Sequence, residues 1–272
     1  MTAVCFNGAF LPADQPLFTA QNRCFKWGDG VFETMRVAEG AVKLVDLHTE
    51  RLFLSLKLME ISVPAAFTKE HLAERILSLC VHNGCIQSAR VRLAVYRNDA
   101  NEAEYVIEAF PFATEPLSWN REGYSIGLYP YTRKSADAFA NLKTANFLPY
   151  VLAARYATER GLDDCLVLNA AGHICDSSKA NVFIVKNGAV HTPALHQGCI
   201  NGVMRRYVGE GLKKQRIVLH QDQLTEADLL DADEVFLTNA IIGIKWVRQY
   251  KGKTYGHALG YDLFQALFSD YF

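Results

Sequence analysis

The sequence predicts an α+β protein of two domains, and three observations support this prediction. The chain has 272 residues, where one domain takes about 150. Half of these residues are hydrophobic, which is enough to form cores without disulfides. Period-two strands mix with stretches of helical spacing, and a polar segment around Pro116 divides the chain. We therefore expect a smaller N-terminal α+β domain over residues 1–115 and a larger C-terminal mixed β domain with helices over residues 116–272.

The first half begins with a hairpin that turns at Asn7-Gly8, a dipeptide suited to positive φ. A helix is predicted to end at Asn83-Gly84, a typical helix stop. In a later strand Arg90 and Arg92 share one face. The predicted elements after the hairpin are strands 31–37 and 41–45, helices 46–61 and 69–82, and strands 89–96 and 105–110.

The second half is predicted to mix strands with three helices. A hairpin turn is expected at Asn187-Gly188, and Gly161 closes a long helix. The predicted elements are strand 124–129, helix 145–160, strand 166–169 with a partner from 174, strands 181–185 and 189–191, helix 202–214, strand 216–220, helix 225–230, and strands 234–237 and 244–250.

Composition narrows the classes of function. With 28 Lys+Arg against 29 Asp+Glu the net charge is −1, so the chain offers no general surface for nucleic acid. The first twenty residues fit neither a signal peptide nor a membrane span, so we expect a cytoplasmic protein and no membrane contact. The eight histidines do not cluster at ligand spacing, and no metal site is expected. Buried thiols are predicted for the seven cysteines, which form no C-x-x-C pair and stand at positions 5, 24, 80, 85, 165, 175 and 199.

Common motifs for phosphate loops, zinc hydrolysis, serine hydrolysis and dinucleotide binding are missing. Lys143 lies at the entry to a predicted helix, where it is either a solvated lysine on the helix shoulder or a functional amine. Gly202 begins a helix, where free N–H groups favour a phosphate, although glycine also suits a plain loop-to-helix junction. These fragments make chemical sense only together.

Six fragments, in this order over nearly the whole chain, resemble the class IV (fold type IV) pyridoxal-phosphate enzymes. That family includes branched-chain aminotransferases, D-amino-acid aminotransferases and 4-amino-4-deoxychorismate lyases. The fragments are Lys26-Trp-Gly-Asp-Gly-Val-Phe-Glu-Thr, Leu47-His-Thr-Glu-Arg-Leu, Leu142-Lys-Thr-Ala-Asn, Asp176-Ser-Ser-Lys-Ala-Asn-Val-Phe, Ile200-Asn-Gly-Val-Met-Arg and Ala232-Asp-Glu-Val-Phe-Leu-Thr-Asn-Ala.

The resemblance implies pyridoxal 5'-phosphate as cofactor and assigns roles by position. Lys143 matches the lysine that holds the cofactor aldehyde as a Schiff base and then moves a proton, which needs an amine that is neutral part of the time. Arg51 matches the phosphate arginine, whose planar fork suits a phosphate. The backbone amides of Val203 and Met204, with Ala240, resemble the rest of the phosphate-binding site.

Asp176 departs from the family, which usually has glutamate there to keep the pyridine nitrogen protonated. Aspartate is one methylene shorter. Three consequences are open: the loop that carries Asp176 moves toward the cofactor, a water bridges the carboxylate and the pyridine nitrogen, or the cofactor withdraws electrons less strongly. Asp176 as a plain turn residue at a strand end is the remaining alternative.

Three features bear on the choice within the family. Asn146 follows Lys143 at the third position, as in D-amino-acid aminotransferases and the lyases, which disfavours branched-chain substrates. Thr34 resembles the threonine of the lyases, where its hydroxyl would relay a proton, although threonine is also an ordinary strand former. The segments 201–205 and 238–240 also resemble the lyases.

Substrate carboxylates are expected to meet an arginine of the strand that begins at residue 89. Arg92 and Arg97 both match arginines used in the family. Strict alternation sends them to opposite faces, so only one is expected to reach the site, and we favour Arg97 at the strand end.

These observations predict a lyase that converts 4-amino-4-deoxychorismate to p-aminobenzoate and pyruvate in the folate pathway. An amino-acid aminotransferase of D-amino-acid or branched-chain type is the alternative, followed by a non-catalytic cofactor-binding relative. A pure binding or scaffold module would need an exposed apolar patch or charge block, which the sequence lacks. The resemblance further implies an active site at the domain interface and a homodimer.

Overall fold

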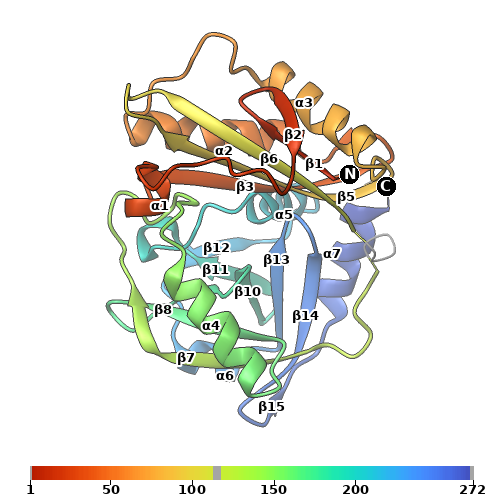
Figure 1. Ribbon diagram of the computed structural model, residues 1–272. Helices are drawn as coiled ribbons and strands as arrows, with labels where there is room; N and C mark the ends of the chain where they lie inside the picture. Colours follow the sequence, from red (N-terminus) through yellow and green to blue (C-terminus); the bar gives the residue numbers. More distant parts are fainter. Residues whose placement is uncertain (1, 113–117, 270–272) are drawn as a thin grey trace. The chain divides into compact units, whose positions relative to one another are not determined.

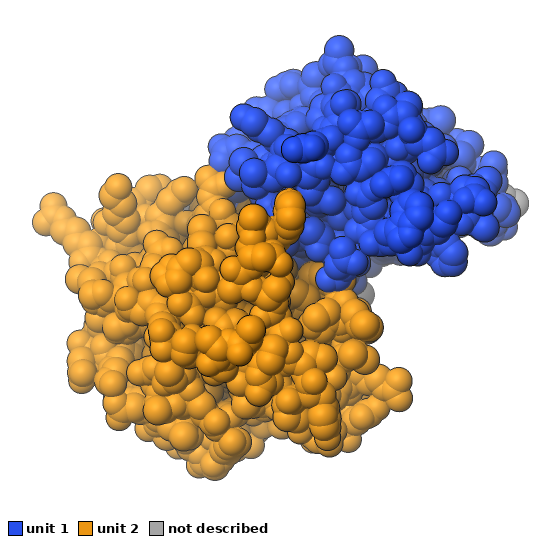
Figure 2. All heavy atoms as spheres, turned by 90° about the vertical axis from the view of Figure 1, so that its left-hand side faces the viewer, with its two compact units in different colours: residues 1–115, 142–146, 272 blue, residues 116–141, 147–271 orange. Residues whose placement is uncertain are grey.

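A computed structural model describes residues 2–112 and 118–269. Its described residues divide into two compact units. Of the described residues, unit 1 holds 2–112 and 142–146, and unit 2 holds 118–141 and 147–269; Figure 2 colours them separately. The predicted link, with Pro116, falls partly on residues 113–117, outside the described residues.

Unit 1 is built on a six-stranded sheet whose neighbouring strands all pair antiparallel, in the order β2-β1-β6-β5-β3-β4 (Figure 1). Asn7 and Gly8 both have positive φ, which confirms the predicted hairpin turn. The strands are β1 Ala3–Phe6, β2 Ala9–Pro12, β3 Gly30–Ala38, β4 Ala41–Val42, β5 Ser88–Arg97 and β6 Ala103–Pro111. The helices are α1 Arg23–Trp27, α2 Val45–Leu58 and α3 Lys69–His82.

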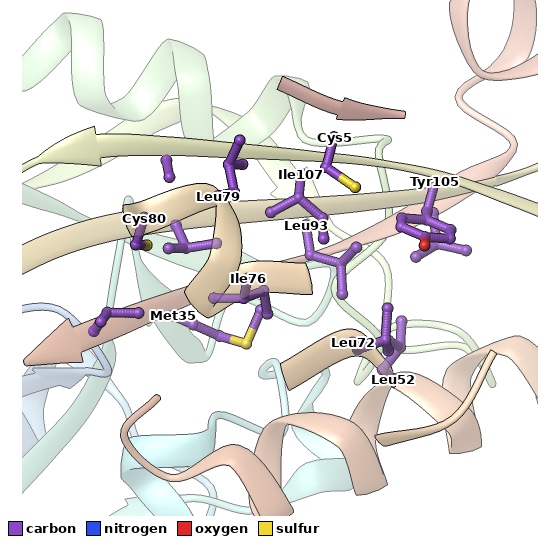
Figure 3. Close-up of a cluster of buried hydrophobic side chains, with 14 of the residues drawn as sticks. Cys5, Met35, Leu52, Leu72, Ile76, Leu79, Cys80, Leu93, Tyr105 and Ile107 are labelled. Atoms are coloured by element: carbon purple, nitrogen blue, oxygen red, sulfur yellow. The ribbon is translucent and has the colours of Figure 1, made fainter. Parts of the chain in front are cut away.

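The core of unit 1 lies between one face of this sheet and the helices α2 and α3. Along β5 the odd positions Val91, Leu93 and Val95 are buried in this core, while Arg90 and Arg92 are not, which confirms the predicted alternation. Figure 3 shows Leu93 and Ile107 of the sheet among core side chains from the helices. The other face of the sheet carries the even residues of β3 and β5.

Unit 2 is built on a nine-stranded mixed sheet in the order β12-β11-β10-β13-β14-β7-β8-β9, with β15 paired to β14. Its parallel pairs are β11 with β12, β14 with β7, and β7 with β8. The strands are β7 Tyr124–Lys134, β8 Asp164–Asn169, β9 Ile174–Ser177, β10 Asn181–Lys186, β11 Ala189–Pro193, β12 Leu219–Asp222, β13 Glu234–Asn239, β14 Gly243–Tyr250 and β15 Lys253–Thr254.

Unit 2 has one helix near the end of the described chain that the sequence analysis did not predict. Ala258–Phe268 forms this helix, α7, which packs on β13, β14 and α5. Its first turn is capped by the buried carboxylate of Glu234, which accepts from the amides of Leu259 and Gly260 at 2.9 and 3.0 Å. The other helical elements are α4 Leu148–Glu159, η1 Leu195–Gln197, α5 Val203–Lys214 and α6 Glu226–Asp231. No helix in residues 2–112 and 118–269 is long and apolar enough to cross a membrane.

The segment 142–146 groups with unit 1, although prediction placed Lys143 in the C-terminal domain at a helix start. The reason is backbone pairing with β3. The Phe32 amide donates to the Lys143 carbonyl at 2.9 Å, and the Ala145 amide donates to the Gly30 carbonyl at 2.8 Å. These bonds hold the segment extended, so α4 begins only at Leu148 instead of residue 145.

Candidate functional site

Lys143 lies against β3 with its ammonium group over an aromatic ring. Its Nζ is 4.8 Å from the ring centroid of Phe32, the residue whose amide binds the Lys143 carbonyl. The main chain and the side chain of Lys143 thus both contact the same residue of β3, Phe32. Lys143 is therefore not on a helix shoulder, because its segment pairs with β3 and α4 begins only at Leu148.

Two other predicted residues lie on the same face as Phe32. The Arg92 guanidinium carbon is 5.1 Å from the Phe32 ring centroid. Thr34, two residues after Phe32, is the cross-strand partner of Arg92 and shares its face. Arg92 also pairs with Glu108 at 3.4 Å, but both side chains are about a third or more exposed, so this pair holds it weakly. Lys143 and Arg92 therefore both lie over the Phe32 ring, and Thr34 lies on the same face of the sheet.

Arg51 lies on the opposite face, buried against Glu33. Its Nε and Nη2 donate to the two Glu33 oxygens at 2.8 and 2.5 Å, and His48 Nδ1 lies 2.6 Å from Glu33 Oε2. Burial raises the pKa of Glu33, but the Arg51 charge and the His48 contact outweigh it and lower this pKa to about 2. Burial lowers the pKa of His48. His48 Nε2 has no hydrogen-bond partner within the described chain.

Arg97, the arginine that the sequence analysis favours for the substrate, forms hydrogen bonds within unit 1. Its Nε donates to Asp29 at 3.0 Å, Nη2 to the Met59 carbonyl at 2.6 Å, and Nη1 to the Glu60 carbonyl and the Asn101 side chain. These bonds tie the end of β5 to the loop after α2. The predicted opposition of Arg92 and Arg97 is confirmed, and the arginine on the Lys143 side is Arg92.

In unit 2 the Asp176 side chain is buried at the end of β9 and surrounded by donors. Its Oδ2 accepts from the Tyr150 hydroxyl at 2.6 Å, the Ile200 amide at 3.0 Å and Lys134 Nζ at 3.4 Å. Its Oδ1 accepts from Asn181 Nδ2 at 2.8 Å. This converging set is more than a turn residue needs.

The predicted phosphate-binding residues lie at the start of α5. Gly202 is the N-cap, and no side chain caps the helix, so the amides of Val203 and Met204 begin it without a side-chain acceptor from the N-cap. A Cβ on Gly202 would overlap the Asn181 side chain. Glycine is therefore required here by close approach.

A buried hydroxyl faces the same place. Thr238 is the cross-strand partner of Asn181, so the two side chains share a face of the sheet. Since Asn181 touches Gly202, Thr238 lies on the side where α5 begins. Its Oγ1 is fully buried and has no hydrogen-bond partner in the described part of the chain. Ala240 follows β13 in a turn where Asn239 Oδ1 accepts from the next two amides, those of Ile241 and Ile242.

These groups fit the cofactor that the resemblance implies. A helix start and an unpartnered buried hydroxyl suit an anion such as phosphate. Asn181, which lies against Gly202 at the start of α5, donates to Asp176 Oδ1. The Asp176 carboxylate suits a protonated ring nitrogen. Sequence reasoning missed Glu33, His48, Lys134 and Tyr150, because each acts through a partner that is distant in sequence.

One protein family matches most of this chain: the Amino-transferase class IV model matches residues 30–250. Methanocaldococcus jannaschii has a "Putative branched-chain-amino-acid aminotransferase" that is 29% identical over 92% of this chain and 88% of its own. An aminodeoxychorismate lyase of Vibrio harveyi is 29% identical over 82% of this chain and 83% of its own. A D-alanine aminotransferase of Listeria monocytogenes is 26% identical over 92% of this chain and 88% of its own.

Solved structures agree on the fold. The branched-chain aminotransferase of Thermoproteus uzoniensis matches with a TM-score of 0.86 and 25% identity, over 96% of this chain and 92% of that chain. The Escherichia coli branched-chain aminotransferase matches with a TM-score of 0.87 and 21% identity, over 99% and 94%. The predicted fold class is thereby confirmed.

Proposed function

Because the chain belongs to the class IV aminotransferases, a family of pyridoxal-phosphate-dependent enzymes, we propose that it is a 4-amino-4-deoxychorismate lyase. The observation that carries the proposal is that Lys143 and Arg92 both lie over the Phe32 ring, on the sheet face that also carries Thr34. A base, a hydroxyl and a carboxylate-binding cation are the groups that the reaction needs. The Vibrio harveyi relative supports the same choice.

Each residue has a defined task in this proposal. Bound pyridoxal 5'-phosphate withdraws electrons from the carbon that carries the substrate amine. Lys143 holds the cofactor and removes the proton from that ring carbon. Thr34 relays a proton toward the oxygen that leaves with the three-carbon side chain. The C–O bond breaks with its electron pair, the released enol becomes pyruvate, and the ring becomes p-aminobenzoate.

Binding is divided among the remaining residues. Arg92, which is partly exposed, holds a substrate carboxylate. Val203, Met204, Ala240 and the Thr238 hydroxyl bind the phosphate, and Asp176 binds the ring nitrogen. The Arg51 guanidinium, set by Glu33, adds its charge to the phosphate.

The assay is product formation by purified protein with added cofactor. Formation of p-aminobenzoate from aminodeoxychorismate, with no half-reaction on D-alanine, D-glutamate or L-leucine, is the expected result. Thr34→Val should lower kcat by about 100-fold, whereas Thr254→Val, at an exposed threonine of β15, should leave it unchanged. Rapid conversion of the cofactor to its pyridoxamine form by an amino acid, without lyase activity, contradicts the proposal.

The second candidate is an amino-acid aminotransferase. It is favoured by the Methanocaldococcus and Listeria relatives, whose printed names are those of aminotransferases. In that case Lys143 moves the proton to the cofactor's aldehyde carbon, and the product is a 2-oxo acid. A non-catalytic relative would be colourless as purified and would carry no cofactor on Lys143 after borohydride reduction.

The proposal extends to a cytoplasmic homodimer in folate biosynthesis, in which loops of one subunit complete the site of the other. Sedimentation of the purified protein tests the assembly. A dimer at assay concentration is expected, and a fully active monomer would refute this part.

A further inference from the structure

Asp176 is held asymmetrically by the protein. A carboxylate offers about four acceptor sites, two on each oxygen. Oδ2 receives three donors, from Tyr150, Ile200 and Lys134, at 2.6, 3.0 and 3.4 Å. Oδ1 receives one, from Asn181 at 2.8 Å. Among the described residues, therefore, the acceptor capacity that remains on Asp176 belongs to Oδ1.

Charge compensation for the buried carboxylate comes from Lys134. Burial raises the pKa of Asp176, and the Lys134 charge and the Tyr150 hydrogen bond act against this rise. Burial also raises the pKa of Tyr150 well above its usual value, so its hydroxyl stays a donor. The Cys175 and Cys199 thiols nearby have raised pKa values and remain uncharged. Lys134 is thus the cation that favours an ionised Asp176.

Both partners are fixed by the fold. Lys134 follows a bulge in β7, pairs with Asn169 of β8, and donates to the Ala140 carbonyl at 2.7 Å. Tyr150 lies in the first turn of α4, and its ring stacks on Phe147 at 4.4 Å. The Ala140 carbonyl and the Phe147 ring thus help to hold the two side chains at Asp176.

We propose that Lys134 and Tyr150 are positioning residues that anchor Oδ2 of an ionised Asp176, so that Oδ1 accepts the N–H of the cofactor's pyridine ring. The inference rests on the cofactor part of the proposed function. In this proposal Lys134 and Tyr150 orient the aspartate, whose side chain is one methylene shorter than that of glutamate. Neither residue touches the substrate, so their effect passes through Asp176.

The test is nitrogen-15 NMR of pyridoxal 5'-phosphate labelled at the ring nitrogen and bound to the protein. The wild type should show the shift of a protonated pyridine. Lys134→Met should move the signal toward the unprotonated form and raise the cofactor Kd by about tenfold. Tyr150→Phe, which removes one oxygen atom, should change the nitrogen signal and the cofactor Kd in the same direction as Lys134→Met, but by less. Lys134→Arg should restore the wild-type signal.

A matched control is Tyr250→Phe. Tyr250 is another buried tyrosine whose hydroxyl donates to a carboxylate, Glu226, at 2.7 Å. The Tyr250→Phe substitution should leave the nitrogen signal unchanged, even if it lowers the stability of the protein. Thermal unfolding of the cofactor-free variants identifies those that fold, and Lys134→Gln replaces Lys134→Met if the latter does not.

The outcomes separate this inference from the proposed function. A protonated nitrogen in both the Lys134 and Tyr150 variants, with unchanged Kd, overturns the inference and leaves the lyase proposal intact. A shifted nitrogen in a protein without lyase activity supports the inference and refutes the lyase. A wild type that binds no cofactor overturns both.

Discussion

At the scale of single residues, β3 divides the polar groups of unit 1 between two faces. Thr34 lies on the face of Lys143 and Arg92, while Glu33 on the other face binds Arg51 and His48. Alternation alone predicts this division. It does not predict the partners, because Arg51 and His48 come from a helix whose packing depends on the whole core.

Gly202→Ala is the sharpest test of the phosphate site at this scale. The new methyl group would overlap Asn181, whose Nδ2 already donates to Asp176 and to the Ile200 carbonyl at 2.8 Å each. We expect the start of α5 to shift and the Kd of pyridoxal 5'-phosphate, measured by fluorescence titration, to rise by about tenfold or more.

Gly209→Ala in the same helix is the control for this substitution. Its methyl group would meet only Leu219 Cδ2, at an ordinary 3.4 Å. Alanine should then stabilise α5 by about 1 kcal/mol and leave the Kd unchanged. Equal Kd values for the two variants would contradict the role of the α5 start.

The position of Asp176 could be found from the sequence, but the groups that hold it could not. Lys134 reaches Asp176 through the order of the strands β7, β8 and β9, and Tyr150 reaches it through the packing of α4 on β7 and β8. Arg97 shows the same limit. Its position at a strand end was correct, yet its guanidinium is used by backbone carbonyls of a distant loop.

At the scale of elements, local signals decided which helices could be predicted. The helix 69–82 was predicted with the bounds of α3, because Asn83-Gly84 follow its end. The structure adds a local start signal, since the Thr68 side chain caps the first turn. In α7 the buried residues Leu263, Phe264 and Phe268 have helical spacing, but its N-cap, His257, forms no side-chain cap. Its start depends on Glu234, which lies outside the helix, so no local signal announced it.

Glu234→Gln should therefore weaken α7 without removing it. One acceptor oxygen is replaced by a donor, so one of the two amides in the first turn loses its partner. We expect a loss of about 1–2 kcal/mol in the free energy of unfolding, measured with urea. Glu210→Gln, at an exposed position of α5, is the control and should be neutral. A neutral Glu234→Gln would mean that the caps contribute nothing.

At the scale of the whole molecule, the cluster of Glu33, Arg51 and His48 makes stability depend on pH. Both Glu33 and His48 have lowered pKa values in the folded protein, so the unfolded chain binds more protons as the pH falls. Stability should decrease first as the pH drops below about 6.5, through His48. It should decrease again between the ordinary glutamate range and about 2, through Glu33.

Urea unfolding at a series of pH values measures this dependence. His48→Gln should remove the first decrease, because glutamine does not titrate. His82→Gln, at an exposed histidine at the end of α3, should retain it. If stability is constant from pH 7 to 5 in the wild type, His48 is not buried in its neutral form.

Most of the order of elements was predictable along the chain, because hairpins and helix stops are local. The interleaving of the two units was not. Residues 142–146 look like the start of a helix in sequence, and only their hydrogen bonds to Gly30 and Phe32 make them part of unit 1. Long-range backbone pairing leaves no periodic pattern in so short a segment.

This interleaving sets an order of events during synthesis. The N-terminal residues of unit 1 leave the ribosome first, and a domain usually folds as it emerges. Here the edge of β3 at Gly30 and Phe32 finds its partner only after residue 145 has been made. Unit 1 therefore stays unfinished until the chain has passed through the first strand of unit 2, and Lys143 arrives as the segment that completes it.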